Sequence, residues 1–123
     1  MMVPASPNLR RRAYWQGHVA EIIAAWVLRF KGWQILARRW QSGQGEVDLI
    51  ARRGRVVIFV EVKYRKTLAQ GREAITETQW RRIEAAADIF MARQPALRHC
   101  SWRFDAICVT ASGRAHHFQD MRR

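Results

Sequence analysis

The sequence is short of acidic residues and of long apolar runs, and each shortage narrows what the protein can be. Ten aspartates and glutamates stand against 22 lysines and arginines in 123 residues, which gives a formal charge of +12. So basic a balance predicts a polyanionic partner, above all nucleic acid. The most apolar stretch, residues 22–28, is far below the roughly 20 residues that a membrane-spanning helix needs. We therefore expect no membrane partner.

Cysteine is also scarce, since the chain has only Cys100 and Cys108. Both fall near the ends of one predicted strand, about 26 Å apart at about 3.3 Å per residue, whereas a disulfide needs Cα atoms within about 7 Å. Arg10–Arg12 resemble the start of a signal peptide, but His18 and Glu21 interrupt the apolar stretch and no small-residue cleavage site follows. We expect reduced thiols and a cytoplasmic protein.

Several familiar catalytic patterns are missing. There is no Walker-type glycine loop and no serine-hydrolase motif, and the four histidines lack the spacing of metal ligands. The sequence also has no internal repeat. The carboxylates and the basic residues are the remaining carriers of chemistry.

The chain is long enough for one domain, and 49% hydrophobic residues can supply its core. Residues 1–12 contain two of the three prolines and end in three arginines, which predicts a flexible basic arm, either solvated or in contact with phosphates. Residues 13–123 form the predicted domain. Its expected elements are a helix over 14–30, strands over 33–40, 46–51 and 56–64, a polar mobile loop over 65–72, a second helix opening at 76–79, a strand over 101–110 and a short strand near 115–118.

The second helix has clear signals. Thr76 and Gln79 have the spacing of a capping box, in which each side chain bonds the other residue's backbone N–H. Apolar residues then recur at helical spacing. They are Trp80, Ile83, Ala86, Ala87 and Phe90.

The strands over 46–51 and 56–64 predict a β-hairpin whose turn lies around residues 52–55. With a turn of two or four residues, we expect Asp48 opposite Phe59 and Glu61 opposite Glu46. A three-residue turn with a bulge would break this parity. In the even case one face of the hairpin carries Glu46, Asp48, Glu61 and Lys63.

Carboxylates on apolar strands are costly unless something pairs with them. Asp48 and Glu61 would be diagonal neighbours, roughly 7–8 Å apart at the backbone, from which both could reach one Mg²⁺. Such an ion polarises a phosphate and activates water, and Lys63 on the same face could orient that water. The alternative is a ladder of surface salt bridges, against which Val57 and Phe59 on that face argue.

These residues resemble a known motif. Asp48, then twelve residues, then Glu61-Val62-Lys63 is similar to the signature of the PD-(D/E)XK nuclease superfamily. More narrowly, Glu21 on a leading helix, the segments GEVDLI and FVEVKYR, and Arg103-Phe104-Asp105 resemble the YraN family of small endonuclease-like proteins, which is related to archaeal Holliday-junction resolvases. The resemblance extends over residues 14–109.

The resemblance implies an α/β fold of the restriction-endonuclease type, a mixed sheet flanked by helices in the order α-β-β-β-α-β. It adds Glu21 to Asp48 and Glu61 as ligands of Mg²⁺ or Mn²⁺, and makes Lys63 the fourth catalytic residue. Without the resemblance, the helical spacing of Glu21 would indicate a glutamate at the edge of a buried stripe, paired with an arginine. Gln79 stands where the family usually has lysine.

Two further acids have weaker interpretations. Glu46 could be a ligand, a support for the ligands or an arginine's partner. Asp105 is expected to fix an arginine rather than bind metal. The expected nucleic-acid surface comprises Arg38, Arg39, Arg52, Arg53, Arg65, Lys66, Gln79, Arg81 and Arg82.

The sequence thus favours a metal-dependent endonuclease that hydrolyses DNA, with branched or structured DNA as the expected substrate and DNA favoured over RNA. One alternative is a non-catalytic nucleic-acid-binding module on the same fold. Another is a basic protein-interaction subunit. A homodimer would suit a cut in two strands, because twofold symmetry matches a twofold substrate.

Overall fold

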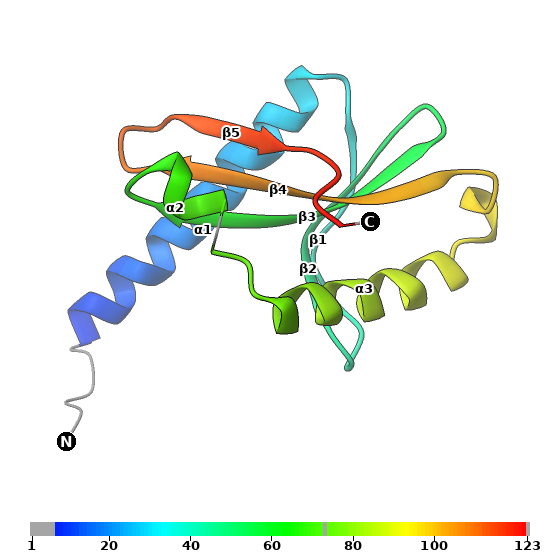
Figure 1. The fold of residues 1–123 in the computed structure, drawn as a ribbon, viewed down its shortest axis with the longest axis horizontal. Coiled ribbons are helices and arrows are strands. Elements are labelled where there is room, and N and C mark those ends of the chain that lie inside the picture. Colours follow the sequence, from blue (N-terminus) through cyan, green and yellow to red (C-terminus); the bar gives the residue numbers. More distant parts are fainter. Residues whose placement is uncertain (1–6, 73, 123) are drawn as a thin grey trace.

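The protein folds as a five-stranded sheet with helices on both faces (Figure 1). This computed structural model describes residues 7–72 and 74–122. Side chains are described for residues 16–71 and 74–122. The elements in chain order are α1 (Pro7–Phe30), β1 (Gln34–Gln41), β2 (Glu46–Arg53), β3 (Val56–Arg65), α2 (Leu68–Arg72), α3 (Glu77–Ala92), a 3-10 turn (Pro95–Leu97), β4 (Ser101–Thr110) and β5 (Ala115–Phe118).

The strands lie in the order β1-β2-β3-β4-β5. β3 and β4 run parallel and the other neighbours antiparallel, so the sheet is mixed. The crossover from β3 to β4 contains α2 and α3. The α/β class and the flanked mixed sheet are as predicted, and β5 extends the order to α-β-β-β-α-β-β once the short α2 is set aside.

The core lies on both faces of the sheet, because β3 is central and sends alternate side chains to each face. Ile58 and Val60 pack with α1, whereas Val57 and Phe59 pack with α3. All four are fully buried. The predicted stripe of α3 is buried in full, and its capping box between Thr76 and Gln79 is present.

Two local predictions about helices need correction. α1 begins at Pro7 rather than near Tyr14, so residues 7–12 of the predicted arm are helical, and residues 1–6 lie outside the described residues. The predicted loop over 65–72 contains the short helix α2. It packs closely on β4, since a Cβ added to Gly71 would lie 2.0 Å from Cys108 Sγ. Within the described ranges, no helix is both long and apolar enough to cross a membrane.

The hairpin turn has two residues, Gly54 and Arg55, with Gly54 at φ +60°. Ile50 therefore pairs with Phe59, so the predicted pairing of Asp48 with Phe59 is wrong by two residues. The two strands extend further into the turn than expected. The even parity is confirmed over the paired residues, which end at Leu49 and Val60, and Asp48 and Glu61 are the next residues on the two strands.

Candidate active site

The candidate site lies where β2 and β3 separate. Their pairing ends at Leu49 and Val60. Just beyond, Asp48 Oδ2 accepts a hydrogen bond from the backbone N–H of Val62 at 2.8 Å. The Asp48 side chain thus lies between the parting strands, where a second hydrogen bond joins its carboxyl to that of Glu61. The sheet itself forces these two acids together.

Both carboxyls are hard to ionise. Burial, followed by the negative charge of Asp48, raises the pKa of Glu61 to about 8. Burial also raises the pKa of Asp48, against the hydrogen bond from Val62, which favours the ionised form. Burial and their mutual repulsion therefore oppose ionisation of both carboxyls together, as for other closely spaced acids, and favour the protonated form of Glu61 at neutral pH.

Lys63 completes this cluster on β3. Its Nζ lies 3.5 Å from Glu61 Oε1, and both side chains are only 15% exposed. A partly buried ammonium beside a carboxyl pair is placed to hold a water or a phosphate oxygen. The structure thus brings together three of the four predicted catalytic residues.

A small cavity next to Glu61 opens toward α3. Glu46, Gln79, Arg82 and Ile83 line it together with Glu61. The capping box fixes Gln79 there, because its Oε1 accepts the Thr76 N–H at 3.0 Å. Glu46 borders the cavity and its Oε2 accepts a long hydrogen bond from Gln41.

Gly45 explains why the acidic segment lies against α3. A Cβ at this position would lie 2.0 Å from the carbonyl oxygen of Arg82 and 2.8 Å from its carbon. Only glycine allows the loop before β2 to touch the helix backbone. This contact sets the position of Glu46 and Asp48 relative to Gln79.

The predicted fourth residue, Glu21, faces the site from α1 but is already paired. Arg39 Nε lies 3.0 Å and 3.1 Å from the two Glu21 oxygens. The negative charge of Glu21 still reaches Asp48, whose pKa it raises. The arginine pairing that the spacing of Glu21 suggested is therefore present, and its role as a metal ligand stays a prediction.

The donor set suits a small hard cation held by few protein ligands. No three His, Cys, Asp or Glu side chains among the described residues surround one point as a metal cluster. Asp48 and Glu61 do offer two adjacent carboxylates, and Mg²⁺ commonly uses one or two carboxylates with waters and substrate oxygens. A divalent ion would stabilise the ionised form of both carboxyls, because metal ligands must be deprotonated.

The expected basic surface divides into two regions. Arg52 and Arg53 lie at the hairpin turn, about 13 Å and about 17 Å along β2 from Asp48 at about 3.3 Å per residue. There Arg52 bonds the Gly54 carbonyl, and Arg53 lies over the Trp33 ring and bonds the Lys31 carbonyl.

The other predicted residues lie nearer the carboxyls or on the outer side of α3. Arg38 is exposed on β1 and Arg82 lines the cavity, whereas Arg81 pairs with Glu77. Arg65 bonds the Tyr64 carbonyl and Lys66 is exposed.

Sequence reasoning missed a second buried cluster, built on Asp105. Burial opposes ionisation of this carboxyl, but hydrogen bonds from His117, Arg103 and the Asp120 N–H outweigh it and lower its pKa. Lys31 Nζ lies 3.2 Å from the other ring nitrogen of His117. The expectation that Asp105 fixes an arginine is confirmed. Its histidine partner is twelve residues away, and no local pattern indicates it.

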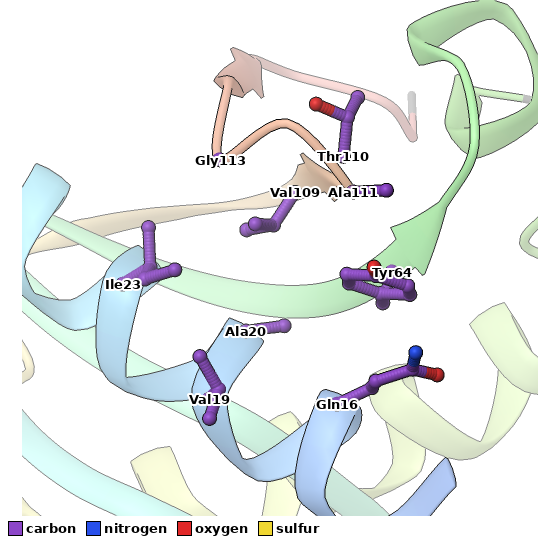
Figure 2. A pocket seen from close by; sticks show the side chains of 9 residues that line it. All are labelled: Gln16, Val19, Ala20, Ile23, Tyr64, Val109, Thr110, Ala111 and Gly113. Atoms are coloured by element: carbon purple, nitrogen blue, oxygen red, sulfur yellow. The ribbon is translucent and has the colours of Figure 1, made fainter. Parts of the chain in front are cut away.

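A second cavity lies away from the carboxyl pair. It has a volume of about 270 Å³ and lies between α1 and the ends of β3 and β4 (Figure 2). Val19, Ala20 and Ile23 point into it from the helix, opposite Tyr64 and Val109. No acid is among the described residues that line this apolar groove, so it offers no carboxylate to a ligand.

Comparison with known proteins identifies the family. Residues 20–109 match the model of "Uncharacterised protein family UPF0102", which covers most of the chain and all the candidate catalytic residues. The chain belongs to the UPF0102 family. This confirms the resemblance to YraN proteins at the level of the family.

UPF0102 relatives share about half of their residues with this chain. A UPF0102 protein of Chelativorans is 51% identical over 100 residues, which cover 81% of each chain. One of Mesorhizobium japonicum is 52% identical over 100 residues, 81% of this chain and 80% of its own. One of Bartonella bacilliformis is 47% identical over 110 residues, 89% of this chain and 90% of its own.

Proposed function

We propose that this UPF0102 protein is a metal-dependent endonuclease of the PD-(D/E)XK superfamily, with a restriction-endonuclease-like fold, that hydrolyses phosphodiester bonds in DNA. One observation carries the proposal. Asp48 and Glu61 meet where β2 and β3 part, with raised pKa values and Lys63 beside them. Such a pair is costly to keep without a cation, and perturbed groups of this kind concentrate at functional sites.

The residues would divide the work of hydrolysis. Asp48 and Glu61 would hold Mg²⁺ or Mn²⁺, which supplies a Lewis acid for the phosphate and lowers the pKa of a bound water. The Lys63 ammonium would orient the attacking water and offset charge that builds on the phosphate oxygens. Water would add to phosphorus, and the bond to one ester oxygen would break, leaving a phosphate end and a hydroxyl end.

The basic residues would position the nucleic acid. Arg82 and Gln79 border the carboxyl site, so they would contact the strand that is cut. Arg52 and Arg53 lie at least about 13 Å farther along β2 and would contact phosphates about four or five nucleotides away, at about 3.4 Å per phosphate of a duplex strand. This spread fits within one duplex arm, and the proposal of branched DNA rests on the resemblance to the YraN family.

Calorimetric titration with Mg²⁺ and Mn²⁺ tests the metal site. Wild type should bind one ion, and Asp48→Asn should bind at least tenfold more weakly. Asp88→Asn removes the same charge from the exposed side of α3 and should bind as wild type does. The proposal fails if folded wild type binds neither metal.

A cleavage assay on linear and four-way-junction DNA tests the reaction. Cleavage should need the metal and fall by orders of magnitude in Asp48→Asn and in Glu61→Gln. Survival of cleavage in both variants would point to a contaminating nuclease.

A non-catalytic binding module is the second candidate, and the pairing of Glu21 with Arg39 favours it. That pairing leaves two carboxyls at the centre of the site, and Gln79 replaces the family's usual lysine. This candidate predicts DNA binding that is indifferent to Asp48→Asn and to metal, so the same measurements separate the two.

A further inference from the structure

Arg39 lies on the edge strand β1, facing the carboxyl site. Its neighbours Arg38 and Trp40 pair with Leu49 and Val47, so the register places Arg39 across from Asp48. Its backbone is left-handed, with φ +49°, which is uncommon for a residue other than glycine. Residues held in such a conformation concentrate at functional sites, where the surrounding structure enforces them.

The twist in the backbone directs the guanidinium to α1. Arg39 Nε bonds both oxygens of Glu21, and Nη2 lies 2.7 Å from His18 Nδ1. Because a guanidinium only donates, that histidine nitrogen must accept. The Arg39 side chain is nevertheless 43% exposed, whereas that of Glu21 is 12% exposed. The arginine is thus paired and still accessible from solvent.

The charges of the site explain what this pairing achieves. Three acids, Glu21, Asp48 and Glu61, face two cations, Lys63 and Arg39. A divalent cation bound among these acids would compete with Arg39 for the Glu21 carboxylate, and the negative charge of a backbone phosphodiester would offer the guanidinium another partner.

We propose that Arg39 is an exchangeable counter-ion: it holds Glu21 while the site lacks metal, and it binds a backbone phosphate of the substrate once a divalent cation has entered. The inference rests on the proposed function and assigns a substrate contact that forms only with metal. Glu21 is then released toward the cation. Arg39 is a positioning residue for Glu21 in one state and a phosphate contact in the other.

The test compares DNA affinity with and without a cation. Binding of a fluorescent four-way junction is measured in EDTA and in Ca²⁺, which is used here because it commonly allows binding without cleavage. Arg39→Gln should weaken binding by at least about fivefold in Ca²⁺ and by less than about twofold in EDTA. In Ca²⁺ it should also reduce the slope of log K against log salt concentration by about one, as expected for one lost phosphate contact.

Arg38→Gln is the matched control, because it removes the same charge from the exposed neighbouring residue. Its loss of affinity should be equal in the two conditions. Arg39→Gly provides a second variant, because glycine accepts the left-handed backbone and should fold. Circular dichroism checks its folding. It should behave as Arg39→Gln does.

Two outcomes would overturn the inference alone. An equal loss with and without Ca²⁺ would make Arg39 a permanent phosphate contact, and no loss in either would make its pairing with Glu21 purely structural. If calorimetry finds no Ca²⁺ or Mn²⁺ bound to wild type, the proposed function and the inference both fail.

Discussion

At the scale of single residues, the site is a set of acids that the sheet has brought closer than their charges favour. Burial raises the pKa of both Asp48 and Glu61, and the nearby ammonium of Lys63 offsets only part of this effect. This arrangement has a cost in stability that depends on pH. It also includes Lys63, whose role in cleavage can be tested separately from metal binding.

The Glu61 carboxyl should make the metal-free protein less stable as pH rises. Its pKa is about 8 in the folded state against an ordinary value of 4.5, so between these values the folded state holds a proton that the unfolded state has lost. Stability should therefore fall as pH rises from about 4.5 to about 8, by at most about 1.4 kcal/mol per pH unit for one proton.

Urea unfolding in EDTA across this range measures the effect, with Glu61→Gln as the comparison. The difference between the two proteins isolates Glu61 from groups such as Asp105, whose lowered pKa acts in the opposite sense. A difference that does not change with pH would show that Glu61 ionises normally.

Lys63→Ala should separate metal binding from cleavage. The Lys63 ammonium contacts Glu61 but is not a ligand, so the affinity for Mn²⁺ should stay within a few-fold of the wild-type value. Cleavage should fall by about 10² or more, because its assigned role is at the water and the transition state. Calorimetry and a cleavage assay on the same preparation measure both; equal losses in the two would contradict the assignment.

At the scale of elements, the position of the site depends on how the loop before β2 meets α3. Gly45→Ala forces a methyl group into the backbone of Arg82, a rigid neighbour. We expect a loss of about 1–3 kcal/mol in unfolding free energy, as for other overpacked positions. Metal affinity should fall as well, because Asp48 follows three residues later.

Gly17→Ala is the control for this change. Its added Cβ meets nothing within 4 Å and lies inside α1, so it should stabilise the protein by up to about 1 kcal/mol. Thermal unfolding of the two variants should shift in opposite directions. Matching shifts would mean that the contact of Gly45 with α3 is dispensable.

Elements with local signals could be predicted from the sequence. Patterns among neighbouring residues indicate the capping box and the apolar stripe of α3. They also indicate the alternation of side chains within the hairpin. The short α2 has too few residues for a periodic pattern. The predicted hairpin register was wrong by two residues. The sequence Arg52–Arg55 is compatible with turns of two or four residues, and packing decides between them.

The candidate site divides in the same way. The motif indicated Asp48, Glu61 and Lys63, because strand alternation alone places them on one face. The partner of Glu21 could be foreseen only as an unspecified arginine. Arg39 is that arginine because its backbone in β1 is left-handed, and no local sequence pattern indicates this conformation.

At the scale of the whole molecule, the charge of +12 should govern association with nucleic acid. If about six phosphates are neutralised on duplex DNA, log K should fall against log salt concentration with a slope of about −5. Fluorescence anisotropy between about 50 and 200 mM salt measures this slope. A slope near −1 would show that the basic surface serves another purpose.

The twisted backbone at Arg39 also affects how the molecule behaves in a crowded solution. β1 is an edge strand, and an unpaired edge invites addition of a strand from a second molecule. Here the strand carries a bulge between Ile35 and Ala37, the left-handed residue and two exposed arginines in succession. Interruptions and charges of this kind oppose edge-to-edge aggregation. The irregularity that directs Arg39 toward Glu21 therefore also opposes the addition of a strand from another molecule at this edge of the sheet.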